Sequence, residues 1–372
     1  MDTVNQGHQE HIHINGPWPV KTTAYDDELL TSWLIRSALA NGCDPISLTS
    51  YLWGSWRTWA TDLDRNIPQQ KLNILSDMFP ANTVPFQKMT LPPIIHQIHN
   101  QQFPSNSISP WILSLGIRNR NRKGGLQYCP KCFETEEPYY RINWRLAWHT
   151  CCSKHQTQLL DKCHECGLVL EPHKLKADCG SMKQCTCCKA LLTEQIAPPV
   201  SQNTLLFQAT CDQALQMGQV NFYGSNLSSQ RWFELCIFLI LFIKRIAKMN
   251  HQKLLHFVHI IKLPFQSIPN HTAALENMTT NHRFALFHAL QHLLSTHPNQ
   301  IMNALLEADV SQQAFAPKNV LLPGCYQNIY NQLPQSTYNR AEKKYLKAPL
   351  PRPRPRHEVE RKALDIIRAL HQ

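Results

Sequence analysis

Four pairs of potential metal ligands, each with two residues between its members, crowd into the segment from residue 129 to residue 188. Zinc prefers four sulfur or nitrogen ligands in a tetrahedron, so two such pairs complete one site. The first predicted set is Cys129, Cys132, Cys152 and His155, and the second is Cys163, Cys166, Cys185 and Cys188. Because both sets are already four-coordinate, we expect two structural zinc ions per chain that fold a segment with little core of its own.

The spacing alone does not decide which residues bind each metal ion. The further candidates are Cys151, Cys179, Cys187 and His164. Cys151 or Cys187 could enter a site only with a changed gap to the second ligand of its pair. We therefore keep the pairs separated by two residues and interpret Cys151, Cys179 and Cys187 as free thiols.

The cysteine content also bears on the cellular compartment. The chain has 14 cysteines among 372 residues, and ten of them lie between Cys129 and Cys188. The polar N-terminus shows no apolar leader, and the longest apolar run, Leu235 to Ile243, has nine residues, whereas a membrane span needs about 20. We therefore expect a cytoplasmic protein without a membrane partner, in which thiols stay reduced and bind metal.

Helical periodicity dominates outside the cysteine-rich block, so the predicted fold class is mainly α. Tyr25 to Gly42 predicts an amphipathic helix, and Asp44 and Pro45 predict the cap and first residue of a second one. A third is expected over Gln69 to Met78. These helices are compatible with a helix-turn-helix that reads DNA and equally with a small helical bundle.

Helices are also predicted after the cysteine-rich block. They span residues 203–218, 231–250 and 282–308. The last of these is expected to break near His297 and Pro298. The run Trp232 to Ile243 is apolar nearly all round, which predicts a buried central helix. Cys211 and Cys236 are expected to pack in that helical core.

The predicted organisation has five parts. They are a polar tail (1–20), an N-terminal helical domain of helix-turn-helix type (21–125), a tandem zinc-ribbon or zinc-finger module (126–195), a C-terminal helical domain (200–335) and a basic Pro/Arg tail (336–372). In the basic tail, prolines alternate with arginines over 349–356, which favours an extended polyproline segment. Helical spacing returns in the last residues, 358–372.

The net charge of +11 favours nucleic acid or another acidic partner. The candidate contacts are Arg118, Arg120, Arg122, Lys123, Arg141, Arg145, Arg352, Arg354 and Arg356. The first four belong to a loop ended by glycines, which could hold phosphates or could simply be solvated. Arg141 and Arg145 are four residues apart and would share one face of a helix.

Catalytic zinc keeps an open position beside three protein ligands, whereas both sets here have four. The sequence also lacks an HExxH motif, a phosphate-binding GxxxxGK[ST] loop and the H-x-E of zinc deaminases. We therefore predict no catalytic residues and no enzyme activity for this chain.

The order of several motifs resembles the TniQ family, to which the TnsD-type target selectors of bacterial transposons belong. The motifs are Tyr128-Cys-Pro-x-Cys132, Pro138-Tyr-Tyr-Arg141, Trp144-Arg-Leu146, Cys152-x-x-His155, Cys163-x-x-Cys-Gly167 and Cys185-x-x-Cys188, together with the earlier "DELLTSWLIRSALANG" and "WATDLDR". The resemblance covers roughly residues 20–195. Ser153 departs from it, because the family often carries proline after the third ligand.

The resemblance implies target-site selection during transposition. Such proteins bind DNA, or dock on an RNA-guided Cascade complex with its guide RNA in CRISPR-associated transposons. They recruit an AAA+ transposition ATPase of the TnsC or TniB type, and some form homodimers. A zinc-finger transcription regulator that binds DNA is the alternative function for the same residues.

Overall fold

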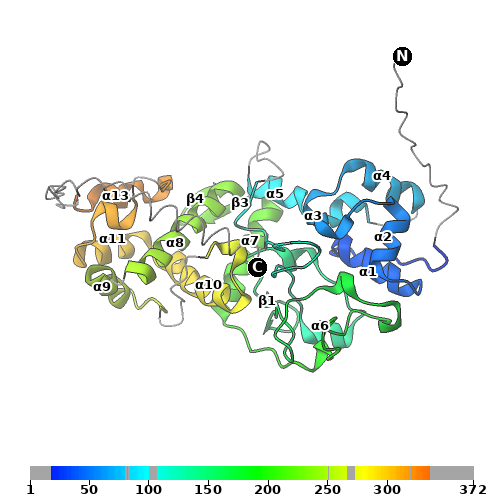
Figure 1. Cartoon of the computed structure of the whole chain (residues 1–372). Helices are drawn as coiled ribbons and strands as arrows, with labels where there is room; N and C mark the ends of the chain where they lie inside the picture. The colour runs from blue at the N-terminus through cyan, green and yellow to red at the C-terminus, as the bar shows by residue number, and fades with distance from the viewer. Residues whose placement is uncertain are drawn as a thin grey trace, which may run out of the picture.

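The computed structural model describes residues 18–79, 82, 84–99, 107–249, 251–265, 273–317 and 320–335. These residues are mainly helical, which confirms the predicted fold class. Figure 1 shows the N-terminal helices at one end of the molecule and helices α9 (Gln252–Ile260), α11 (Pro298–Glu307) and α13 (Gln327–Gln332) at the other. The cysteine-rich block lies below the middle.

Three N-terminal helices lie in the predicted segments: α1 (Leu30–Ala40), α2 (Pro45–Trp53) and α4 (Gln69–Met78). Two more, α3 (Leu63–Asn66) and α5 (Pro92–Ile98), are not predicted from the sequence. Gly42 takes a positive φ of 67° after α1, a conformation that glycine adopts at little cost. Helices α1 to α4 enclose a core of their own, in which Trp33 packs against Trp18 and Phe86. This core fixes the angle between α1 and α2.

Asp44 precedes α2 as predicted, but its carboxylate has a different role from the expected cap. One oxygen accepts a hydrogen bond from the backbone N–H of Ala177 at 2.8 Å, and the other accepts from Lys176 Nζ at 2.8 Å. The start of α2 relies on Pro45 at its first position. Asp44 therefore connects the N-terminal helices to the cysteine-rich block.

The cysteine-rich block contains little regular secondary structure. Helix α6 (Pro130–Thr135) is short, and strands β1 (Cys151–Cys152) and β2 (Thr157–Gln158) form a small antiparallel pair. Isolated bridges join Lys162 to Val169 and Gln184 to Leu191. The polypeptide here is organised by tight turns around the cysteines.

The C-terminal helices pack around α8 (Ser229–Met249), which is buried along most of its length as the apolar run predicts. Its neighbours are α7 (Gln202–Met217) and α10 (Thr280–Ser295). Cys211 and Cys236 are both fully buried, which confirms their predicted place in the core. A hairpin of β3 (Gln219–Phe222) and β4 (Ser225–Ser228), which the periodicity does not predict, joins α7 to α8.

The predicted break in the last helical stretch is confirmed. Helix α10 ends at Ser295, and Pro298 is the first residue of α11. Helix α12 (Gln312–Phe315) follows. Within the described residues, every helix is too short or too polar to cross a membrane.

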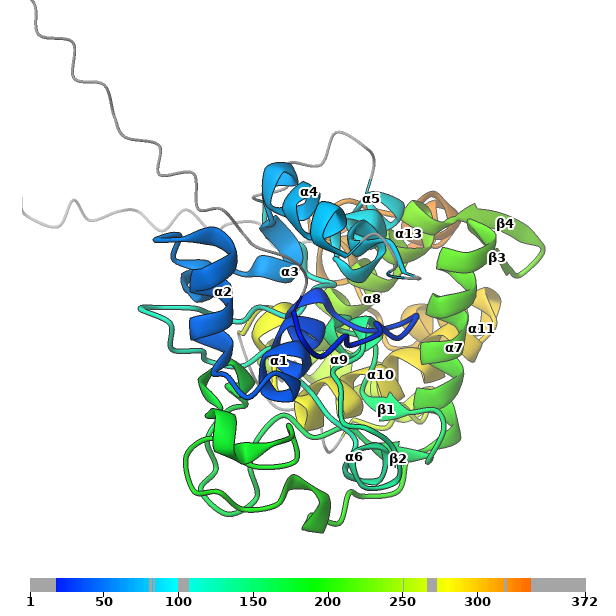
Figure 2. The same ribbon diagram turned by 90° about the vertical axis from the view of Figure 1, so that its right-hand side faces the viewer.

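Figure 2 views the molecule from its N-terminal end, with α7 and the β3–β4 hairpin to the right of α1 and α2. One large apolar core runs from the cysteine-rich block into the C-terminal helices. In it, Trp111, Trp148 and Phe233 meet with ring centroids 5.0 to 6.0 Å apart. The domain boundaries that the sequence predicts, between residues 125 and 126 and between residues 195 and 200, stay predictions.

Candidate metal centres

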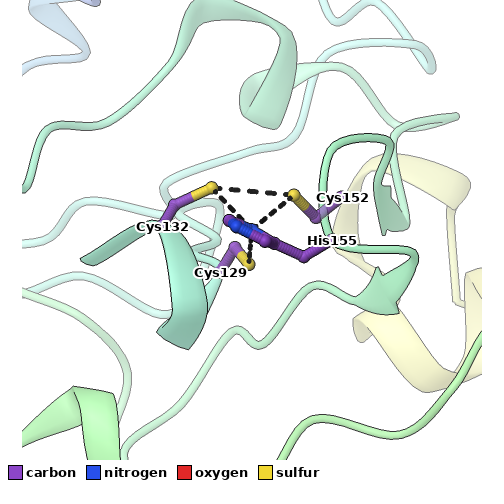
Figure 3. Close-up of side chains that lie close together, drawn as sticks. All are labelled: Cys129, Cys132, Cys152 and His155. Carbon is purple, nitrogen blue, oxygen red and sulfur yellow. Dashed lines mark hydrogen bonds between the residues drawn. The ribbon is translucent and has the colours of Figure 1, made fainter. Parts of the chain in front are cut away.

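The first set of predicted ligands comes together at the junction of α6 and the β1–β2 pair (Figure 3). Cys129 directly precedes α6, and Cys132 lies within it. Cys152 ends β1, and His155 lies in the turn to β2. Four residues that are 26 positions apart at the extremes thus face one point.

The distances within this set fit a tetrahedral metal. His155 Nδ1 lies 3.4 Å from Cys129 Sγ, 3.3 Å from Cys132 Sγ and 3.6 Å from Cys152 Sγ. Cys132 Sγ and Cys152 Sγ are 3.6 Å apart. With ordinary bond lengths, tetrahedral zinc separates two sulfurs by about 3.8 Å and sulfur from nitrogen by about 3.5 Å. The sulfurs are too far apart for a disulfide, and the cysteines are free.

The second set is built from two knuckles with matching geometry. In each knuckle the carbonyl of the first cysteine accepts a hydrogen bond from the backbone N–H four residues later. The donors are Gly167 in the first knuckle and Lys189 in the second. Both of these residues have positive φ, 67° and 65°. Sγ–Sγ distances are 3.5 Å for Cys163–Cys188 and 3.7 Å for Cys166–Cys185. This set is more open than the first, because Cys188 is exposed.

The surroundings favour a thiolate in each set. Side-chain hydrogen bonds from Cys132 and Cys152 hold the pKa of Cys129 far below its ordinary value. The backbone N–H of Ala190 lowers the pKa of Cys188 to about 7. Burial instead raises the pKa of Cys163 to about 12. A bound cation would deprotonate the remaining thiols as they coordinate it.

Each cluster could therefore hold a metal ion, and the donor set suits zinc. In the part of the chain that the structure describes, the side chains of Cys151, Cys179, Cys187 and His164 belong to neither cluster. Cys179 Sγ instead lies 3.5 Å from Lys189 Nζ. Four ligands per site leave a metal no open position for water, so the geometry is that of structural sites.

Cys151 lies beside the first cluster but is held by the helical region. Its backbone N–H donates to Gln208 Oε1 at 3.3 Å, and Gln208 Nε2 donates to the Cys151 carbonyl at 3.2 Å. Gln208 of α7 thus pairs with β1 as a neighbouring strand would. Sequence patterns gave no signal for this residue, because a single glutamine on a helix has no distinctive spacing.

We predict that Cys151→Ala retains both metal ions and Cys152→Ala loses one. Burial raises the pKa of Cys151 to about 11, and its side chain is outside the cluster. Metal analysis of the two purified variants checks this. A Cys151→Ala protein with one metal ion would show that the ligand assignment is wrong.

Arg145 is not available to an external partner, and the predicted nucleic-acid role is wrong for it. Its side chain is fully buried and lies 2.6 Å from Asp62 Oδ2 and 3.3 Å from Asp64 Oδ2. Its guanidinium also donates to the Leu113 carbonyl. The expected helix shared with Arg141 is wrong as well, since only a 3₁₀ turn, Ile142–Arg145, forms here.

Arg141 lies partly exposed and is already engaged. It donates to Asp27 at 2.7 Å and to Glu136 at 2.8 Å, and its guanidinium stacks over the Tyr139 ring. These contacts join α6 and the segment before α1. A phosphate would have to displace two carboxylates, so the structure favours an internal role for Arg141.

The loop predicted to hold phosphates is a tight hairpin. Arg118 and Asn121 exchange two backbone hydrogen bonds of 2.9 Å, and Asn119 and Arg120 both have positive φ. The hairpin is fastened to the second module, where a His173 ring nitrogen lies 2.9 Å from the Arg120 carbonyl oxygen. Burial and nearby cations lower the pKa of His173 to about 3, so this contact involves the neutral ring.

The four cations of this loop do not share one environment. The side chains of Arg118, Arg120 and Lys123 are exposed, whereas Arg122 is 7% exposed and points inward. The prediction of a phosphate contact is therefore wrong for Arg122. Arg352, Arg354 and Arg356 lie outside the described residues.

The fold and the two clusters define a class: a mainly helical protein whose central block is organised by two closed sets of cysteine and histidine. Residues 19–159 match the model of the TniQ family, so this part of the chain is similar to a TniQ domain. TniQ family proteins are non-catalytic components of transposition. The first cluster lies inside the matched segment, and the second lies beyond it. A search of curated proteins finds no match.

Proposed function

We propose that this protein selects target sites for transposition, binding DNA or an RNA-guided Cascade complex and recruiting an AAA+ ATPase. The observation that carries the proposal is the match of residues 19–159 to the TniQ family. A target selector acts by presenting binding surfaces at fixed positions, and in this chain those surfaces would rest on turns that bound metal holds. We also propose that the protein acts in the reducing cytoplasm. In RNA-guided systems it would assemble as a homodimer.

Zinc in both clusters is part of the proposal. With zinc bound, Cys129, Cys132, Cys152 and His155 would fix α6 against the β1–β2 pair. The second cluster would fix the segment that carries His173 and Lys174, on which the arginine hairpin rests. The two sites would then act as structural supports, with no catalytic step of their own.

The hairpin cations form the best supported contact for a nucleic-acid backbone. Arg118, Arg120 and Lys123 are exposed, and a two-residue turn holds their backbone in one conformation. Lys174 beside the turn donates to Asn121 Oδ1 at 2.8 Å and is paired with Glu171 at 2.6 Å, so it supports the turn and is not counted among the phosphate contacts. Cations on a rigid support can contact phosphates in register, which positions a protein on nucleic acid without reading the bases.

We predict that replacing Arg118, Arg120 and Lys123 together by alanine weakens DNA binding equally for all sequences. Each lost phosphate contact should reduce the slope of log K against log salt by about 0.9, or about 2.7 for three contacts. Fluorescence anisotropy with several unrelated duplexes at several salt concentrations measures this slope.

A matched variant removes three exposed lysines in or directly after the C-terminal helices, Lys248, Lys253 and Lys262. It loses the same net charge and should keep the wild-type slope. Equal slopes in the wild-type and hairpin proteins would refute the backbone contact. A changed preference among duplexes would instead indicate that the hairpin reads bases.

A further inference from the structure

A polar pocket lies next to the hairpin of residues 118–121. Its volume is about 450 Å³, and pockets that bind small ligands measure roughly 300–1,000 Å³. The pocket walls come from three separate segments of the chain, 113–127, 161–169 and 276–283. Lys123 belongs both to the hairpin loop and to the pocket wall, so a molecule that contacts this loop can reach the pocket.

Three cations line the pocket, two at the surface and one buried. The side chains of Lys123 and Lys162 are exposed, whereas Arg283 of α10 is 1% exposed. Burial lowers the pKa of Arg283 to about 10, so the guanidinium is still charged at neutral pH. It donates only to uncharged oxygens, which are the carbonyls of Met278 and Ala147, Gln127 Oε1 and Thr280 Oγ1. A buried cation with neutral partners is stabilised by an anion nearby.

Backbone donors lie beside these cations. Gly124 and Gly125 line the pocket, and within the described residues their N–H groups donate to no protein acceptor. Gly125 has a φ of 85°, and a Cβ there would lie 2.6 Å from the Ser114 carbonyl oxygen, so only glycine fits. Free backbone N–H groups next to cations are suited to the oxygens of an anion such as phosphate.

Two carboxylates also line the pocket, and both have partners within the protein. Asp161 Oδ2 accepts a hydrogen bond of 2.9 Å from the backbone N–H of Thr280, at the start of α10. Glu276 is 7% exposed and lies within range of the charges of Arg65 and Lys244. The three cations therefore exceed the carboxylates of the lining by one charge, and the carboxylate charge is partly compensated.

We propose that this pocket binds a phosphate group, and that nucleic acid bound at the hairpin supplies it, which rests on the proposed function. Lys123 and Lys162 pair with the phosphate at the mouth of the pocket. The N–H groups of Gly124 and Gly125 donate to its oxygens, and the buried charge of Arg283 attracts it from behind. The path of the nucleic acid then continues from the hairpin to the start of α10.

Inorganic phosphate tests the pocket without nucleic acid. A Cβ at Gly124 meets nothing within 4 Å, so Gly124→Asp and Gly124→Asn fit equally well and differ only in charge. Isothermal titration calorimetry measures phosphate binding to the zinc-loaded full chain at constant ionic strength. We expect saturable binding to the wild-type protein and a Kd about tenfold higher for Gly124→Asp than for Gly124→Asn, because a like charge lies within a few ångströms of the phosphate. Equal Kd values for the two variants, or no saturable binding to the wild-type protein, would overturn the proposal.

DNA binding identifies the source of the phosphate. Lys162→Ala should reduce the slope of log K against log salt by about 0.9, as for one lost phosphate contact. Lys248→Ala, at an exposed lysine of α8, should keep the wild-type slope. Phosphate binding together with an unchanged slope in Lys162→Ala would support the site but overturn its filling by nucleic acid, and would identify free phosphate as the ligand. A wild-type protein that bound no DNA would refute the proposed function, whereas the phosphate titration would still test the pocket.

Discussion

Replacing Cys132 by alanine is expected to reduce the metal content from two zinc ions per chain to one and to unfold the region around the first cluster. Cys132 is 3% exposed and belongs to the same apolar core as Phe133, Trp144 and Trp148. Metal analysis gives the zinc content. Tryptophan fluorescence reports the unfolding, since the buried indoles would enter water and their emission would shift to longer wavelength.

The size of the effect follows from how short the metal-held segments are. Structural zinc contributes about 10–16 kcal/mol of apparent binding energy in zinc-finger peptides, and a whole domain is stable by only about 5–15 kcal/mol. Strands β1 and β2 have two residues each, too few to persist alone. The free energy lost with one zinc ligand should therefore be larger than the packing of this region can offset.

The second site separates metal loss from general misfolding. Cys163→Ala should also leave one zinc ion, but its effect on tryptophan emission should be smaller, because the second cluster lies outside the segment that matches the TniQ family and is partly exposed. Cys43→Ala, at a half-buried thiol in the N-terminal region, should change neither measurement. Two zinc ions in Cys132→Ala, or none in the wild-type protein, would contradict the proposed sites.

The grouping of the eight predicted ligands could be read from sequence because the chemistry is local. Two ligands with two residues between them form a turn whose geometry depends on few distant contacts. What the local pattern does not determine is which two turns share a metal ion. Helix boundaries such as Gln69–Met78 and the break before Pro298 are local for the same reason. The positive φ of Lys189 is less visible, since glycine marks the equivalent position in the other knuckle.

Arg141 and Arg145 show what local sequence patterns cannot predict. Spacing could place Arg141 and Arg145 near each other, but the carboxylates that neutralise Arg145 are about 80 positions earlier in the sequence. These two carboxylates belong to the motif "WATDLDR", which is part of the family resemblance. The motif does not indicate which cation the carboxylates bind. A basic residue in a basic chain suggests an external partner, and only the tertiary fold shows that this one is internal.

Replacing Arg145 by alanine is expected to cost about 3–5 kcal/mol of unfolding free energy, because it leaves the buried Asp64 carboxylate without its salt-bridge partner. Asp64 is fully buried and also accepts hydrogen bonds from the Thr31 backbone and hydroxyl. These contacts thus join α1, α3 and the 3₁₀ turn Ile142–Arg145, which lies between the two ligand pairs of the first cluster. Urea unfolding monitored by circular dichroism measures the loss.

Arg141→Ala is the matched control. Its ion pairs with Asp27 and Glu136 involve side chains that are 19 to 41% exposed, so water can replace the lost charge. Exposed pairs of this kind contribute about 0–1 kcal/mol. Arg145→Lys should fall between the two alanine variants, because a single ammonium cannot reproduce the fork that reaches Asp62 and Asp64.

The pH dependence distinguishes a lost charge pair from simple loss of packing. Burial raises the pKa of Asp64 above its ordinary value, and Arg145 opposes that rise. Without Arg145 the pKa should rise further. A carboxyl with a higher pKa in the folded state gains stability as the pH falls, because the folded state then binds more protons than the unfolded state. The stability deficit of Arg145→Ala should therefore shrink between about pH 7 and about pH 5. A deficit that stays constant over this range would mean that Arg145 acts through its volume and not its charge.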